Sequence, residues 1–287
     1  MALLVVSTLV PGGCRNSKYR RTAERRDTLC MGMAEYSNAD TAKGRSVRVK
    51  LKAVYPSPIT GPLSANIAAW VRSNLGTGTP ADTMDAKSVV NYYGGKAFAN
   101  LVAADTDAAF YTDCRVETMR RGYVSLRLTV AESSDDTPGV TTITGVTMRR
   151  SDGAVFGWNM INDTTSKAFR KLMSDGVKRY MQRTLEVKQL DDEDFRNLLL
   201  PWLSKSVAVH GEAAAAIANG KKQLFPVPKT APFLSQKGIT FVYQPCEVAP
   251  YSAGTPVFTV PFSKAEHFMT KEAKKLLEKE KAADAAH

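Results

Sequence analysis

The sequence predicts an α+β fold in which an antiparallel sheet packs with helices, organised as two lobes. Strict alternation of apolar and polar residues begins at Val47 and recurs between Phe110 and Arg150, as expected of half-buried strands. Apolar residues at spacings of three and four indicate helices between and after these strands. The succession of neighbouring strands favours an antiparallel meander over a βαβ arrangement.

The N-terminal lobe is expected to span residues 45–150. Its first strand should end at Pro56-Ser57-Pro58, and Pro62 is suited to the first turn of a helix. A second helix is predicted over residues 85–104. Three strands follow, and Asp152-Gly153 has the composition of a hairpin turn because glycine accepts a positive φ.

The C-terminal lobe is expected to span residues 151–287. Asn162-Asp163 supplies cap candidates for a long helix, and an acidic-led helix is predicted over 191–203. Two short strands, 239–243 and 257–262, should follow. Ser263 to Glu266 has the spacing of a capping box and predicts the start of a terminal helix.

Residues 1–14 are interpreted as a lipoprotein signal. Leu3 to Val10 has the length of a signal-peptide apolar core, and Cys14 follows the small pair Gly12-Gly13. Lipidation of Cys14 would anchor the protein to a membrane. The alternative is a frayed hydrophobic N-terminus.

The formal charge of +11 is unevenly distributed. Between Arg15 and Lys52 eleven Lys or Arg face four acids, which gives +7 and leaves +4 for the rest of the chain. Residues 15–44 therefore predict a basic linker that could contact anionic lipid headgroups. Nucleic-acid binders more often carry basic residues on a folded face among aromatics, so no nucleic-acid partner is expected.

The spacing of the cysteines and histidines indicates no metal site and no cofactor. Cys30, Cys114 and Cys246 form no Cys-x-x-Cys motif, and Cys114 is in phase with the inner face of its strand. Pairing of Cys114 with Cys246 stays open. His210, His267 and His287 lack the spacing of a zinc helix.

Catalysis is not expected from the carboxylates. Asp135-Asp136 falls in a polar turn, and the acids from Asp191 to Asp194 begin a predicted helix, where the helix dipole favours them. A wall-glycan hydrolase that uses these carboxylates is the alternative hypothesis. A basic nucleic-acid binder is a weaker one.

The segment from Gly238 to Phe262 is the candidate ligand-binding region. Two prolines fix φ, and a glycine stands where a left-handed turn is needed, so the chain between the strands should be a defined loop. The loop could contact a partner or could serve the fold alone. The candidate residues are Tyr243, Pro245, Glu247, Pro250, Tyr251 and Gly254.

These residues and the following strand resemble the C-terminal part of the extracellular domain shared by the anti-sigma factor RsiV and the peptidoglycan deacetylase PdaC. Gly145 to Arg150, Asp152-Gly153 and the helix of Phe169 are similar to the strand–turn–strand–helix entry of that domain. The residues from Val47 to the helix of Trp70 are similar to its upstream companion region. The resemblance implies an extracytoplasmic α+β module that binds material at the cell wall without catalysis.

The sequence and the resemblance together predict an exported cell-envelope lipoprotein with a non-catalytic sensor or accessory domain. Its expected location is the periplasm or the outer face of the envelope. Peptidoglycan, an anionic wall polymer or a lysozyme-type hydrolase are the candidate partners. Common lysozymes are themselves basic, so the charge of this chain favours the anionic polymer or glycan.

Overall fold

The structure is a computed structural model that describes residues 29–42, 45–78, 80–81, 84–104, 106–135, 137–208 and 223–284. The expected signal (1–14) and most of the expected linker therefore lie outside the described residues, as does His210. The chain forms two compact units. The first extends to Val140 and includes Met148–Val155, and the second comprises Thr141–Thr147 and Phe156–His287.

A six-stranded sheet has the order β1-β2-β3-β4-β5-β6. The strands β1–β2 and β3–β4 pair antiparallel, whereas β2 and β3 pair parallel because helices α1 and α2 connect them. The expected α+β fold is confirmed, and its sheet is mostly antiparallel. The strands are β1 Met31–Ala42, β2 Arg45–Pro56, β3 Ala108–Met119, β4 Tyr123–Ser134, β5 Thr137–Arg149 and β6 Val155–Phe156.

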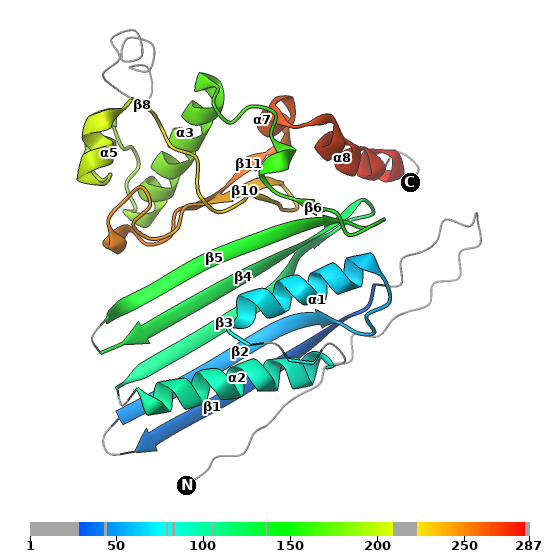
Figure 1. Cartoon of the computed structure of the whole chain (residues 1–287). Coiled ribbons are helices and arrows are strands. Elements are labelled where there is room, and N and C mark those ends of the chain that lie inside the picture. The colour runs from blue at the N-terminus through cyan, green and yellow to red at the C-terminus, as the bar shows by residue number, and fades with distance from the viewer. Residues whose placement is uncertain are drawn as a thin grey trace. The chain divides into compact units, whose positions relative to one another are not determined.

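The two predicted helices of the first unit are present as α1 (Pro62–Leu75) and α2 (Ala86–Ala103). Pro62 occupies the first turn of α1, and the Asp85 carboxylate caps α2 by accepting from the Ser88 amide at 2.8 Å. Both helices lie over the same face of the sheet (Figure 1), α2 against β1 and β2 and α1 against β2.

Strand β1 corrects the expected linker. Met31–Ala42 pairs along its whole length with β2, although residues 15–44 were predicted to be a linker. Ala34 and Tyr36 are its only buried apolar residues among those described. Two buried apolar residues give too little alternation for a strand to be predicted from the sequence. The segment is a strand because it pairs with β2.

The Asp152-Gly153 turn is confirmed. Gly153 has φ +75°, its amide donates to the Arg149 carbonyl at 2.8 Å, and the Arg149 amide donates to the Ala154 carbonyl at 2.9 Å. A side chain at Gly153 would meet the backbone of α1 at 2.9 Å, so the turn needs glycine for space as well as for φ.

The second unit is built around a helix, α3 (Lys167–Thr184), that packs against a three-stranded sheet of order β11-β10-β9. Stacked and edge-to-face rings of Phe169, Phe241, Phe258 and Tyr243 form much of its core. The remaining elements are η1 Trp158–Met160, α4 Asp192–Asn197, α5 Pro201–Ser206, β7 Val207–Ala208, β8 Gln223–Leu224, β9 Phe233–Leu234, β10 Gly238–Val242, η3 Tyr251–Ala253, β11 Val257–Pro261, α7 Phe262–Ala265, η4 Glu266–Phe268 and α8 Lys271–Asp284.

The helix starts predicted for this unit are partly wrong. Ser166, rather than Asn162-Asp163, caps α3 by accepting from the Phe169 amide at 3.3 Å. The predicted capping box at Ser263 lies inside the short helix α7, and α8 begins eight residues later. There the Thr270 hydroxyl accepts from an α8 amide.

The predicted helix over 191–203 is also corrected, because it divides into α4 and α5. Proline at position 201 has no amide to continue the hydrogen bonding of α4, but it is suited to the first turn of α5.

Candidate functional site

Tyr243, the first residue of the predicted ligand-binding loop, is fully buried. Its hydroxyl donates to the Pro226 carbonyl at 2.6 Å, and its ring stacks on Phe258 at 6.3 Å. Burial raises the pKa of the Tyr243 phenol well above its usual value, with the nearby Glu247 carboxylate adding to the effect. This side chain holds the base of the loop and is not accessible to a ligand.

The Glu247 carboxylate closes the turn that follows. One oxygen accepts from the Gln244 amide at 2.8 Å, and the other accepts from the Lys229 amide at 2.5 Å. The same turn holds Cys246 at φ +62°. Glu247 therefore satisfies backbone donors of two separate segments at once.

Gly254 adopts φ +71°, as the sequence predicted for a left-handed turn. The Tyr180 hydroxyl of α3 donates to the Ala253 carbonyl at 3.1 Å, which fastens the short helix η3 to α3. Pro250 is exposed, and Pro245 and Tyr251 are half-buried. All six predicted residues thus lie in one loop, with Tyr243 at its buried base, and the ligand-binding role of the other five stays a prediction.

The acidic cluster considered for catalysis has structural partners. The Asp191 carboxylate accepts from the Asp194 amide at 2.7 Å at the start of α4, and Asp192 forms a 2.8 Å ion pair with Lys178 of α3. Asp136 lies outside the described residues. Among the described residues no group of three or more His, Cys, Asp or Glu could hold a metal ion.

A hollow of about 430 Å³ opens beside the C-terminal end of α3, against strand β11. We call it the basic pocket. Its lining consists of Arg179, Gln182, Arg183, Glu186, Val187, Lys188, Phe258 and Thr259.

The wall of the basic pocket ends in a tight helix cap. The Glu186 amide donates to the Arg183 carbonyl at 3.2 Å, and the Val187 amide donates to the Gln182 carbonyl at 3.1 Å. These bonds define a Schellman motif whose left-handed position is held by Glu186 at φ +56°. Val187, which lines the pocket, is 41% exposed, and Leu185, which precedes Glu186 in the chain, is 48% exposed.

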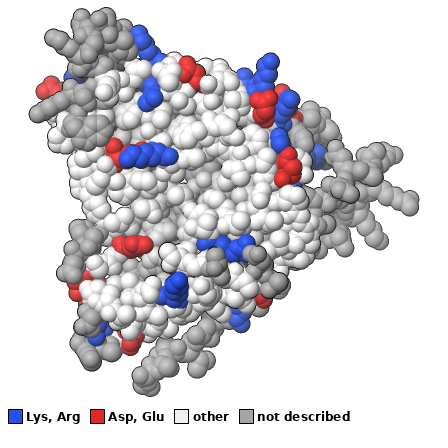
Figure 2. Space-filling model, viewed as in Figure 1, with Lys and Arg blue, Asp and Glu red and all other residues white. Residues whose placement is uncertain are grey.

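The charge of the basic pocket is uncompensated within the described part of the chain. Three exposed cations, Arg179, Arg183 and Lys188, face a single acid, Glu186, and none of the three side chains bonds to another described residue. On the face seen in Figure 2 acidic and basic side chains are interspersed, several of them side by side. Local arrangement, rather than the overall +11, therefore sets what a pocket attracts.

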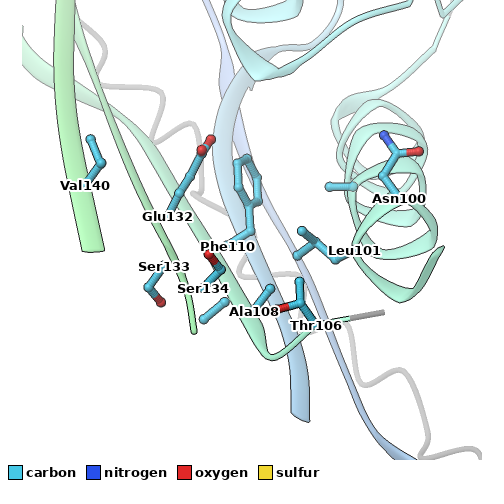
Figure 3. A pocket seen from close by; sticks show the side chains of 11 residues that line it. Asn100, Leu101, Thr106, Ala108, Phe110, Glu132, Ser133, Ser134 and Val140 are labelled. Carbon is cyan, nitrogen blue, oxygen red and sulfur yellow. The ribbon is translucent and has the colours of Figure 1, made fainter. Parts of the chain in front are cut away.

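A second hollow, of about 410 Å³, lies in the first unit at the C-terminal end of α2 (Figure 3). We call it the α2 pocket. Its lining consists of Ala97, Asn100, Leu101, Thr106, Ala108, Ala109, Phe110, Glu132, Ser133, Ser134 and Val140. Most of the lining surface is apolar, and Glu132 is its single ionisable group.

Sequence reasoning identified neither pocket, although a signal for each was present. Arg179 and Arg183 are four apart, so they share one face of the predicted long helix. Glu132 continues the alternation of Leu126, Leu128 and Val130, which places a carboxylate on the inner face of β4.

Residues 162–263 match the model of DUF3298, a family described as "Protein of unknown function". The match falls within the second unit and covers α3, the basic pocket and the predicted loop. It does not extend to the first unit. No curated protein matches the chain.

Two solved structures of DUF3298 proteins share the fold of the chain. One, from Bacteroides fragilis, aligns with a TM-score of 0.57 at 13% identity and covers 87% of this chain and 97% of its own. The other, from Pseudomonas aeruginosa, aligns with a TM-score of 0.56 at 14% identity over 86% and 97% of the two chains. The likeness covers both units, so the arrangement of elements in each is shared with these proteins.

No helix in the described part of the chain combines the length and the apolar character that crossing a bilayer requires.

Proposed function

We propose that the protein is an exported component of the cell envelope that binds an anionic wall polymer without transforming it, and that the basic pocket is the binding site. The single observation that carries the proposal is the set of three exposed, unpaired cations around one hollow of the DUF3298 domain. Their charges sum to +3 against the −1 of Glu186, which leaves a local charge of +2.

The geometry suits repeated anionic groups. Arg179 and Arg183 are one helical turn apart on α3, and Lys188 follows the cap. A guanidinium presents planar paired donors to carboxylate or phosphate oxygens, and a lysine adds a mobile point charge. The exposed Leu185 and Val187 offer apolar contact beside these groups.

A structural role explains part of the arrangement but not all of it. Cations near the C-terminal end of a helix are stabilised by its dipole, which accounts for Arg183. The dipole does not account for Lys188, which lies beyond the Schellman motif. Lys188 is not needed to cap the helix either, because the Gln182 and Arg183 carbonyls already accept from backbone amides. The placement of three cations around a hollow therefore supports an anionic ligand.

Export rests on the sequence. The apolar run from Leu3 to Val10 and the Gly12-Gly13-Cys14 stretch suit a lipoprotein signal. The resemblance to the RsiV and PdaC extracellular domain supports a place at the cell wall. The periplasm or the outer face of the envelope is the proposed location, with lipid on Cys14 as the anchor.

The binding proposal is tested with a glycerol phosphate polymer and with purified peptidoglycan, using the full chain. We expect salt-sensitive binding, because exposed charge interactions are screened at physiological ionic strength. Replacement of all three cations (R179A/R183A/K188A) should weaken binding by about tenfold or more, since each exposed charge contact contributes about 0.5 kcal/mol or more.

The matched control removes the same charge from another surface of the same unit. Lys264, Lys271 and Lys275 are exposed and have no bonded partner among the described residues. The K264A/K271A/K275A variant keeps the basic residues 15–52, so any binding by that segment is common to both triple variants. Equal losses in the two variants, or binding of neutral dextran with similar affinity, would disprove a specific site.

The location proposal has a separate test. Expressed from its own leader in a bacterium that processes lipoproteins, the chain should incorporate labelled fatty acid, and Cys14→Ala should abolish incorporation. A cytosolic protein with an intact N-terminus would refute export and leave the binding proposal standing.

A further inference from the structure

The α2 pocket combines an aromatic ring with a single carboxylate. Phe110 of β3 and Glu132 of β4 are directly opposite partners in the antiparallel register. Side chains of such a pair project from the same face of the sheet. Figure 3 shows the ring and the carboxylate extending side by side toward the same end of the hollow, with Leu101 and Asn100 of α2 across from them.

Glu132 lies on the face of the sheet where the strand otherwise presents apolar residues. Leu126 and Leu128 of β4 precede it on that face and are buried, and Val130 is half-buried. Helix α2 covers β1 and β2, and beside its C-terminal end the face of β3 and β4 is left open.

No described cation neutralises this carboxylate. The Glu132 side chain is exposed and bonds to no other described residue. In the sequence, residues 105–113 contain three acidic residues, residues 131–140 contain Glu132 and two more, and neither segment contains Lys or Arg. These two segments are therefore acidic in a chain whose formal charge is +11.

We propose that the α2 pocket binds an organic ammonium group attached to a short apolar chain. The ammonium would sit between the Glu132 carboxylate and the Phe110 ring, since a cation is attracted both to a carboxylate and to an aromatic face. The apolar chain would lie against Ala97, Leu101 and Val140. A volume of about 410 Å³ falls in the range of small-molecule sites.

The experiment uses the full chain and three probes of equal length: hexylammonium, hexanol and hexanoate. Binding is followed by protein NMR titration of the residues around the pocket. Hexylammonium should bind most tightly, and hexanoate least, because only the cation matches both groups. Equal affinity for hexylammonium and hexanol would reduce the site to a general apolar hollow and overturn the proposal, as would the absence of hexylammonium binding.

Variants identify the groups responsible. Glu132→Gln keeps the shape and removes the charge, so hexylammonium binding should weaken by about tenfold, the equivalent of about 1.4 kcal/mol. Phe110→Leu keeps an apolar residue and removes the ring, so binding should weaken about fivefold.

The control is Asp113→Asn on the same strand β3. Residues 110 and 113 are three apart on the strand, so their side chains lie on opposite faces. This variant changes the net charge by the same amount as Glu132→Gln and should bind hexylammonium with little change. A loss that matches that of Glu132→Gln would assign the effect to overall charge and overturn the proposal.

Discussion

The Tyr243 hydroxyl donates a 2.6 Å hydrogen bond to the Pro226 carbonyl from a fully buried position. This bond joins the end of β10 to the segment that follows β8, and the ring lies between Phe225 and Phe258. Tyr243→Phe keeps the ring and removes the donor, which leaves a carbonyl without its partner. We expect a loss of about 1–2 kcal/mol in the free energy of unfolding.

Chemical denaturation of the full chain measures this loss. Tyr111→Phe is the control, because Tyr111 is 39% exposed and its hydroxyl bonds to no other described residue. It should change the free energy of unfolding by less than about 0.5 kcal/mol. Similar values for the two variants would show that the buried bond does not stabilise the loop.

Gly94 and Gly95 are adjacent residues of α2 with opposite surroundings. A β-carbon at Gly94 would lie 2.4 Å from the Tyr36 ring of β1, whereas one at Gly95 would meet nothing within 4 Å. Gly94→Ala should destabilise the first unit by about 1–3 kcal/mol through this overlap. Gly95→Ala should stabilise it by up to about 1 kcal/mol, because alanine is the better helix former.

Thermal unfolding compares these two variants, and a double mutant tests the cause. Gly94→Ala should cost less in a Tyr36→Ala background than in the unmodified chain, since Cγ and Cδ1 of the ring, the atoms nearest to the added β-carbon, are then absent. A Gly94→Ala variant as stable as Gly95→Ala would contradict the close approach of α2 and β1.

Tyr36 also illustrates which parts of the fold could be predicted. The strands β2 to β5 carry long apolar alternation, and the helices carry apolar faces, so their existence follows from the sequence. Strand β1 buries mainly Ala34 and Tyr36, and its neighbours are polar and small. Its structure depends on the partner strand β2 and on the space that Gly94 leaves for Tyr36. Neither contact can be predicted from the local sequence of β1.

Glu186 is one of two non-glycine residues with positive φ among those described, and it lies on the rim of the basic pocket. A left-handed conformation costs residues with a β-carbon about 1 kcal/mol or more relative to glycine. Glu186→Gly should therefore raise the free energy of unfolding by about 0.5–1 kcal/mol. It should also strengthen polyanion binding, because it removes the one acid of the pocket.

Glu278→Gly is the control for Glu186→Gly, since it makes the same change at an exposed position inside helix α8. There glycine should cost about 1 kcal/mol. Denaturation gives the stabilities, and the glycerol phosphate titration gives the affinities. Destabilisation by Glu186→Gly would show that the observed backbone angle is not strained, and weaker polyanion binding would contradict the proposed site.

The candidate site could be predicted only in part, because sequence patterns report local structure and not contacts between distant segments. The loop from Tyr243 to Gly254 has a strong local signature of prolines and a glycine, and the left-handed turn at Gly254 follows from it. The two pockets combine residues distant in the sequence, such as Lys188 with Phe258 and Leu101 with Glu132. Helical and strand periods tell which face a residue occupies, but not which element packs beside it.

Cys114 and Cys246 were considered as a disulfide pair, and both are free thiols in the structure, Cys114 buried and Cys246 exposed. Burial raises the pKa of the Cys114 thiol to about 12. Because the thiolate is the reactive form, iodoacetamide at pH 8 should modify Cys246 in the native protein and spare Cys114 until the chain is unfolded. Mass spectrometry of the alkylated peptides measures both, and equal modification of the two would contradict the burial of Cys114.

The same pKa shift gives a pH dependence of stability. The folded state holds the Cys114 proton more tightly than the unfolded state, whose thiol has a pKa of about 9. The contribution of the Cys114 thiol to the free energy of unfolding is therefore complete below pH 9. It is lost as the pH rises from 9 toward about 12, because the unfolded state releases the proton at lower pH than the folded state does. Cys114→Ala should flatten that part of the stability profile, whereas Cys246→Ala should leave it unchanged. If Cys114→Ala leaves the stability profile unchanged, the loss of stability at alkaline pH arises from another group.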